Sequence, residues 1–339
     1  MSFWYSCLSY FCSIGSYFVA YGGRTIERAT NLLPQFQRKR TFDYDKAVDG
    51  MRQMPWGVFK KMVIADNCAM AVNKIWSAYY DEYGLTLLIV AILFTFQINC
   101  DFSGYSDIAI GCARMFGFNL MRNFNFPYFS RSIPEFWRRW HISLTTWFRD
   151  YIYIPLGGSH CSKWKAIRNV FIVWAVSGLW HGANWTFVCW GLFHAICLVI
   201  YNLFGINTKY QQVVACGRIL PSIKEFCQMV LTFSLVVVSW IIFRAEAISE
   251  AMNYLTTMLS NPFFDHSPSP NDMMAYKRLV MCVPLLIVEW LQRNKQHVLQ
   301  FPNCRPFNWA LVRYTLYFCI LFSIVLLMGD VQTFIYFQF

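Results

Sequence analysis

A run of forty consecutive residues, from Asn169 to Thr208, contains no Lys, Arg, Asp or Glu. Because a membrane-spanning helix needs about 20 mostly apolar residues, this run is long enough to cross a bilayer twice. The motif GLWHGANW interrupts it and places His181 three residues before Asn184. A histidine at membrane depth is costly and usually faces a protein interior or a wet cavity. The run therefore predicts two membrane helices with a polar group held between or beside them.

The composition extends this conclusion to the whole chain. Hydrophobic residues make up 57% of the sequence and charged residues 14%, whereas soluble domains carry about 25% charged residues. A soluble multidomain enzyme is therefore excluded. The net charge of +11 comes from clustered basic residues, which suit loops beside anionic lipid better than nucleic-acid binding.

Hydropathy predicts an all-α protein, a polytopic bundle of transmembrane helices forming one domain over residues 1–339. The segment Pro55–Trp76 mixes apolar residues with lysines and predicts an amphipathic or partly embedded helix. No internal repeat is visible. The candidate spans are Ser2–Gly22, Tyr83–Cys100, Ile167–Gly178 with its flanks, Asn184–Leu203, Phe226–Phe243, Leu279–Leu291 and Trp309–Gly329.

The basic residues orient these spans. The segment from Arg122 to Arg168 holds eight basic residues against two acidic ones and is expected in the cytoplasm. The most acidic loop, Arg244–Arg278, is then expected outside. On this map the WHGAN motif lies near an outer turn or in the outer half of the membrane.

The stretch FWRRWHISLTTWFRDYIYIPLGG (Phe136–Gly158) repeats large aromatic residues at three- and four-residue spacing. This spacing predicts one amphipathic helix with His141 on or beside its apolar face, and with Arg138 and Arg139 largely off that face. The alternative is an interfacial helix whose His141 caps a neighbouring carbonyl group.

The WHGAN motif also allows two interpretations. Gly182 lets another backbone or a substrate approach closely, and Asn184 offers both a donor and an acceptor. A catalytic histidine and a polar tie between two helices both fit His181. For His194 the helix tie is the favoured interpretation.

Acidic residues follow an apolar span in the stretch INCDFSGYSDIAIGCARMFGF (Ile98–Phe118). Asp101 and Asp107 could order a loop, hold a cation or pair with basic residues, and structural pairing is favoured. The sequence contains no GxSxG, HExxH, GxGxxG or P-loop motif, and no metal site is predicted. A neutral imidazole in a membrane cavity could instead take a proton from a hydroxyl that attacks an activated acyl group.

These residues resemble the membrane-bound O-acyltransferase (MBOAT) family, and most closely its bacterial branch of alginate and peptidoglycan O-acetyltransferases and teichoic acid D-alanyl transfer proteins. The resemblance extends from about Leu33 to the C-terminus. The matching stretches are GVFKKMVIADN (57–67), CDFSGYSDIAIG (100–111), the long segment 117–158, SGLWHGANWTFVCWGLFH (177–194) and FIYFQF (334–339).

The resemblance implies transfer of an acyl group, most simply acetyl, from a cytoplasmic thioester through a helix-lined tunnel to a hydroxyl outside. It implies no bound cofactor, with acetyl-CoA or a carrier-bound acyl thioester as donor substrate. His181 matches the signature histidine and would be the general base, and His141 matches a second recurrent polar position. The candidate substrate-binding residues are Trp140, Trp180, Asn184, Arg138, Arg139 and Asp101, with the two arginines meeting an anionic donor.

The implied surroundings follow from the same resemblance. We expect a multi-pass protein of the bacterial cytoplasmic (inner) membrane, acting on a cell-envelope polysaccharide that is alginate-like, peptidoglycan or similar. A periplasmic or extracellular acetyltransferase is the expected partner protein, together with the lipid bilayer. Relatives usually begin with several additional spans, so N-terminal spans are expected to be missing here. The alternatives are a transporter or flippase with a histidine proton relay, and a non-catalytic fragment.

Overall fold

The computed structural model describes residues 28–39, 41–206, 210–263, 269–301 and 309–334, and these residues contain helices but no β-strand. The predicted span Ser2–Gly22 lies outside them. The helices are α2 (Ala29–Gln37), α3 (Tyr44–Val58), η1 (Phe59–Ala65), α4 (Asp66–Trp76), η2 (Tyr79–Asp81), α5 (Gly84–Met115), η3 (Pro127–Phe129), α6 (Ile133–Arg139), α7 (Ile142–Phe148), η4 (Arg149–Tyr153), α8 (Lys163–His181), α9 (Trp185–Leu203), α10 (Ile223–Arg244), α11 (Ile248–Ser260), α12 (Pro270–Leu291) and α13 (Ala310–Leu327).

Four of the described helices are long and apolar enough to cross a membrane, namely α5, α9, α10 and α13. They confirm the predicted spans Tyr83–Cys100, Asn184–Leu203, Phe226–Phe243 and Trp309–Gly329 as helices, and α5 runs further than predicted. In α5, 83% of the apolar window is buried inside the protein, against 6% in α13. The first is therefore a core helix, whereas α13 offers its surface to lipid.

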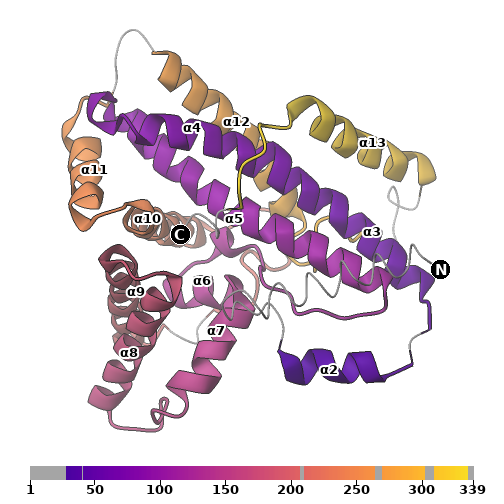
Figure 1. Ribbon diagram of the computed structural model, residues 1–339, viewed down its shortest axis with the longest axis horizontal. Coiled ribbons are helices and arrows are strands. Elements are labelled where there is room, and N and C mark those ends of the chain that lie inside the picture. Colours follow the sequence, from indigo (N-terminus) through magenta and orange to yellow (C-terminus); the bar gives the residue numbers. More distant parts are fainter. Residues whose placement is uncertain (1–27, 40, 207–209, 264–268, 302–308, 335–339) are drawn as a thin grey trace.

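The centre of the molecule is the pairing of α3, η1 and α4 with α5 (Figure 1). A Cβ atom on Gly57 would lie 2.6 Å from the carbonyl oxygen of Gly104, so the two backbones touch at this crossing. The wide π-helical turn η1 places Lys60 inside, where its Nζ lies 2.6 Å from Asp107 of α5. The segment Pro55–Trp76, predicted as an amphipathic or partly embedded helix, is helical and belongs to the buried centre.

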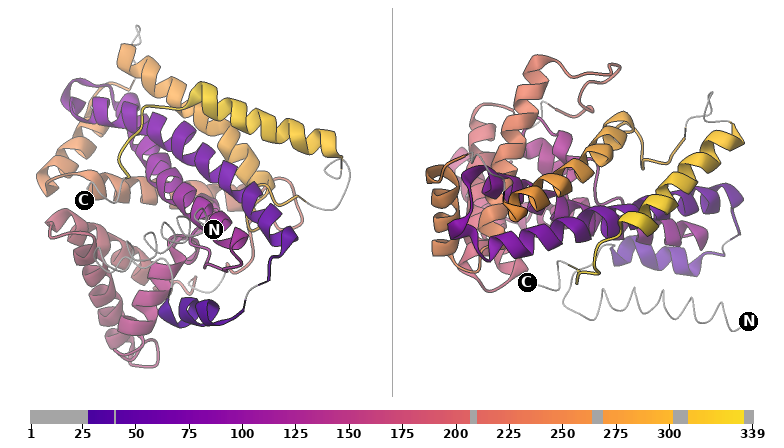
Figure 2. Two further views of the ribbon diagram at one scale, coloured as in Figure 1. Left: turned by 45° about the vertical axis from the view of Figure 1, so that its right-hand side comes forward. Right: turned by 90° about the horizontal axis from the view of Figure 1, so that it is seen from above.

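A second group of helices, α6 to α9, lies on the opposite side of the molecule from α13 (Figures 1 and 2). Here α8 and α9 form a hairpin of two helices over the charge-free run and pack along their length, but of the two only α9 is long and apolar enough to cross a membrane. Gly178 and Gly191 make this contact possible, because a Cβ on either residue would collide with backbone of the facing helix at Phe187 or Trp174. The hairpin, α6, α7 and the inner face of α10 surround the candidate site.

Candidate active site

The predicted single helix over Phe136–Gly158 is wrong, because the chain breaks at His141. Helix α6 ends at Arg139, and α7 begins at Ile142. His141 between them has φ 42° and ψ 55°, in the left-handed region, which is uncommon for a residue with a side chain. The aromatic spacing was real, but it continues across α6, α7 and the π-helical turn η4 and not along one helix.

Hydrogen bonds from a distant segment explain this break. The amide N–H of Asn125 donates to the carbonyl oxygen of Arg139 at 2.9 Å, and the amide of Ile142 donates to the carbonyl of Asn123 at 3.0 Å. The side chain of Asn123 also accepts from the amide of Ser143 at 3.2 Å. Backbone groups at the ends of both helices are thereby satisfied outside a helix. The break is therefore tertiary in origin.

The break buries His141. Its side chain lies edge-on to Phe102 of α5, with ring centroids 4.7 Å apart, and its Nδ1 lies 3.4 Å from the hydroxyl of Ser143. Burial lowers the pKa of His141 from 6.5 to about 3, since a low-dielectric environment disfavours the charged imidazolium. The ring is therefore neutral at physiological pH.

His181 is positioned by a tight turn between α8 and α9. It is the last residue of α8, and Asn184 caps α9 by accepting from the amide of Thr186 at 3.1 Å. A Cβ on Gly182 would lie 2.6 Å from the ring of Phe187, so this position needs a residue without a side chain. The sequence thus specifies this turn locally, through a small residue and an N-cap.

Aromatic rings enclose the imidazole of His181. The nearest are Trp180 at a centroid distance of 4.9 Å, and Trp190 and Phe243 at 5.2 Å each. His181 is 7% exposed. The packing of this ring is therefore set by α8, α9 and α10 together.

A cavity of about 720 Å³ connects the two histidines, because both His141 and His181 line it. This volume falls within the range of about 300–1,000 Å³ typical of ligand sites. Its wall between them is aromatic, because the ring of Trp240 lies 5.2 Å from that of Trp140 and 5.9 Å from that of Trp190. The site is therefore one continuous apolar chamber that carries two imidazoles.

The charges around this cavity all have the same sign. Arg138, Arg149 and Lys163 line it, and no Asp or Glu is among the described residues that do. Cationic groups at one part of an otherwise apolar chamber suit a ligand with an anionic group and an apolar or amphipathic arm. Two of these cations, Arg149 and Lys163, had not been predicted as site residues.

Of the other predicted site residues, some line the cavity and others contact the residues that line it or lie elsewhere. Trp140 and Arg138 line the cavity. Trp180 does not line the cavity, but its ring contacts those of His181 and Phe148, which do. Asn184 points away from it, donating to the backbone carbonyl of Glu246 at 2.8 Å.

Arg139 and Asp101 also lie outside the cavity, in ion pairs within the protein. Arg139 contacts Glu135 at 2.9 Å, and Asp101 lies 2.7 Å from Nζ of Lys61. Structural pairing was the favoured interpretation of Asp101, and its contact with Lys61 agrees with it. For Arg139 the geometry favours support of α6 over contact with a donor. His194 accepts from the indole N–H of Trp137 at 3.2 Å, the predicted tie between helices.

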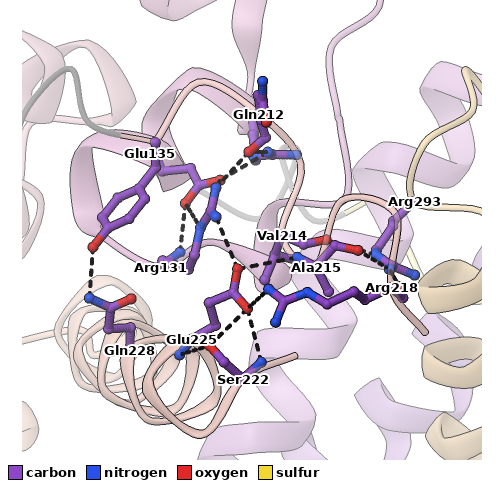
Figure 3. Close-up of polar contacts among 12 residues, drawn as sticks. Arg131, Glu135, Gln212, Val214, Ala215, Arg218, Ser222, Glu225, Gln228 and Arg293 are labelled. Carbon is purple, nitrogen blue, oxygen red and sulfur yellow. Dashed lines mark hydrogen bonds and ion pairs between the residues drawn. The ribbon is translucent and has the colours of Figure 1, made fainter. Parts of the chain in front are cut away.

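Figure 3 shows the polar network that fixes α6 beside the cavity. Glu135, 1% exposed, accepts hydrogen bonds from the guanidinium groups of Arg131 and Arg139. Arg131 also bridges to Glu225 at the start of α10 and to the carbonyl oxygen of Gln212. Since a buried charge requires such partners, this network joins α6, the segment 210–222 and α10 into one unit.

Residues on distant helices complete the chamber, and sequence reasoning did not find them. Trp190, Trp240 and Phe243 belong to predicted spans, where a large aromatic residue is ordinary. They could have been recognised as site residues only from knowing where α10 packs on the α8–α9 hairpin. That placement depends on tertiary contacts, which hydropathy does not report.

Comparison with known proteins shows which family the chain resembles. Residues 56–241 match the MBOAT, membrane-bound O-acyltransferase family. The chain is 43% identical over 233 residues to the probable alginate O-acetylase of Pseudomonas aeruginosa, covering 69% of this chain and 42% of that protein. It is 31% identical over 336 residues to the peptidoglycan O-acetyltransferase of Helicobacter pylori, covering 91% and 60%.

A third relative is the teichoic acid D-alanyltransferase of Bacillus subtilis, 35% identical over 188 residues, covering 52% of this chain and 44% of that protein. The chain thus spans between about two fifths and three fifths of the length of these relatives. All three are named as acyl-transferring enzymes, which gives no support to a transporter or flippase. By the extent of these matches, the chain belongs to the membrane-bound O-acyltransferase family.

Proposed function

We propose that this protein is an O-acyltransferase that moves an acetyl group from a thioester donor to a hydroxyl of a cell-envelope polysaccharide. The observation that carries this proposal is the cavity of about 720 Å³ lined by both His141 and His181. Its relatives named for alginate and peptidoglycan O-acetylation support the acyl group and the acceptor class.

His181 acts as the general base in this proposal. It takes the proton of the acceptor hydroxyl as that oxygen attacks the thioester carbonyl carbon, and the carbon–sulfur bond then breaks. The leaving thiolate recovers the proton from the imidazolium. The acceptor gains an ester and the donor becomes a free thiol, so atoms and charges balance. A positioned base of this kind typically contributes about 10²–10⁴-fold in rate.

His141 has a different task because it lies in the break between α6 and α7 and not at the turn of the WHGAN motif. With a pKa of about 3, its ring is neutral at physiological pH and offers one ring N–H as a hydrogen-bond donor. We assign it the role of holding the donor or the acceptor in the chamber. Arg138, Arg149 and Lys163 would meet the anionic part of acetyl-CoA or of a carrier-bound thioester.

The cavity also suggests an orientation in the membrane. Its three cations belong to the basic segment 122–168, which the positive-inside tendency assigns to the cytoplasm. We infer that the donor enters there, in the cytoplasmic membrane of a bacterium, with several spans crossing it. A separate envelope protein would carry the acetyl group further where the acceptor is distant.

The test is transfer of label from acetyl-CoA in liposomes that contain the full chain. We expect alkali-labile label on a hydroxyl-bearing glycan, with release of one free thiol per acetyl group transferred. Empty liposomes are the control. Uptake of glycan or protons without thiol release would contradict the proposal and favour transport.

A further inference from the structure

A second cavity shares one wall with the first. Its volume is about 350 Å³, and Phe243 lines both cavities. The ring of Phe243 lies 5.2 Å from that of His181 and 4.9 Å from that of Phe187, which also lines the second cavity. The side chain of Phe243, 3% exposed, thus separates the second cavity from the imidazole.

The remaining walls of the second cavity come from α4, the α8–α9 turn and the α10–α11 connection, and hydrogen bonds fix their polar groups. Glu250 accepts from the indole N–H of Trp76 at 2.7 Å through one oxygen. Through the other it accepts from the amide of Glu246, also at 2.7 Å. Asn184 joins the α8–α9 turn to the same connection. Both oxygens of Glu250 are therefore engaged.

Arg244 provides a donor to this cavity. One of its terminal nitrogens donates to the side chain of Asn73 at 2.9 Å, while its Nε–H is buried away from the cavity and has no hydrogen-bond partner among the described residues. It makes no ion pair with a carboxylate in the described ranges. The guanidinium lies over the rings of Trp76 and Phe94, 5.0 and 5.1 Å from their centroids, and its terminal N–H groups are the donors that it offers to a ligand.

The charges indicate which ligand fits. One guanidinium, Arg244, faces two carboxylates, Glu246 and Glu250, so the formal charge of the lining is negative. A small anion would be disfavoured, whereas a hydroxyl can both donate and accept. A lining of guanidinium, amide and carboxylate groups beside an apolar wall is suited to the hydroxyls of a sugar ring, and the volume lies at the lower end of the range for ligand sites.

We propose that the second cavity binds a sugar residue of the acceptor, and that Phe243 is the partition past which its hydroxyl reaches His181. This inference rests on the proposed O-acyl transfer. It places the acceptor beside Arg244 and the thioester in the large cavity. The partition then keeps water from the thioester until an acceptor is bound. Asn73, Asn184 and Arg244 position the sugar, while His181 carries out the proton transfer.

Binding can be measured without turnover. The probes are a neutral N-acetylglucosamine tetramer and a uronic acid tetramer, observed by saturation-transfer NMR with the solubilised full chain and no thioester. We expect the neutral tetramer to bind more tightly, because the formal charge of the lining is negative. Tighter binding of the uronic acid tetramer would contradict this charge argument and identify an anionic polymer as the source of the sugar. Arg244→Gln should weaken binding of the neutral tetramer about tenfold. Arg218→Gln, at an exposed position outside the lining, is the matched control and should not.

Turnover tests the partition. Phe243→Ala should raise acceptor-independent hydrolysis of acetyl-CoA several-fold, because water can then attack the thioester to give acetate and free thiol. Phe243→Leu, which keeps most of the side-chain volume, should stay near the wild-type rate. In Arg244→Gln the KM for the glycan should rise about tenfold, with a smaller change in kcat, because the acceptor is positioned less well.

The inference is overturned if neither tetramer binds, or if Arg244→Gln binds as tightly as the wild type. Unchanged hydrolysis in Phe243→Ala, or acetylation of a serine-bearing protein but of no sugar, would also overturn it. Failure of the proposed function looks different. In that case the wild-type chain releases no thiol from acetyl-CoA with any acceptor, whether or not the sugars bind.

Discussion

The two histidines of the site are held by opposite means. His181 ends a helix, and its turn is specified by neighbours in the sequence, Gly182 and the capping Asn184. His141 lies in a helix break that depends on hydrogen bonds from residues 123–125, about 20 positions away along the chain. Local determinants are visible in a sequence, whereas a break imposed from outside is not. This difference also predicts whether a substitution near each histidine lowers stability, acetyl transfer or both.

The largest effect is expected where the α8–α9 hairpin packs backbone on backbone. Gly191→Leu would drive a side chain into the carbonyl of Trp174, and overpacking against rigid backbone is poorly accommodated. We expect loss of folded protein from the membrane, measured by size-exclusion chromatography after mild solubilisation. Ile196→Leu, at a half-exposed position on the same helix, should elute as the wild type does. A normally folded Gly191→Leu protein would show that the close approach is not required.

Removal of the imidazole of His141 should affect turnover more than folding. We expect His141→Ala to lower acetyl transfer by about 10–100-fold, less than the loss of a general base, because a positioning hydrogen bond contributes less than proton transfer. Transfer rates at saturating acetyl-CoA measure this. His194→Ala, which also removes a buried imidazole but one outside the cavity lining, is the control. Equal losses in the two variants would argue against a special role for His141.

The helix break itself can be weakened at its distant partner. Asn123→Ala leaves the buried amide of Ser143 without its acceptor, at a cost of about 1–3 kcal/mol. We expect a lower thermal midpoint together with reduced transfer, because His141 loses its support. If transfer falls no more than the folded fraction does, the break serves stability alone.

The last expected effect concerns stability alone, as a function of pH. Burial lowers the pKa of His141 to about 3, whereas an unfolded chain binds this proton below about pH 6.5. As the pH falls from about 6.5 toward 3, the unfolded state gains a proton that the folded state does not bind. Stability should therefore decrease by up to ~1.4 kcal/mol per pH unit from this group.

The measurement is the thermal midpoint of the wild type and of His141→Gln between pH 7 and pH 4.5. The variant should show a shallower decline, because it lacks the titrating ring. Parallel curves would mean that His141 is accessible to protons in the folded protein.

The sequence was sufficient for the fold class, for four of the spans and for the WHGAN turn. Charge-free runs and small residues act locally, so they appear directly in the sequence. It was insufficient for the break at His141, because the acceptor Asn123 and the amide of Asn125 lie in another segment. It also missed Trp240 and Phe243, which become site residues only because α10 packs beside the hairpin. The roles of the two histidines remain predictions.

Chemical rescue of His181→Ala tests the central claim most directly. Acetyl transfer by this variant is measured in liposomes, at matched amounts of folded protein, with and without added imidazole. The account predicts a loss of at least about 100-fold, partly and saturably restored by imidazole that enters the cavity beside Trp190. Transfer at the wild-type rate by His181→Ala without imidazole would contradict it.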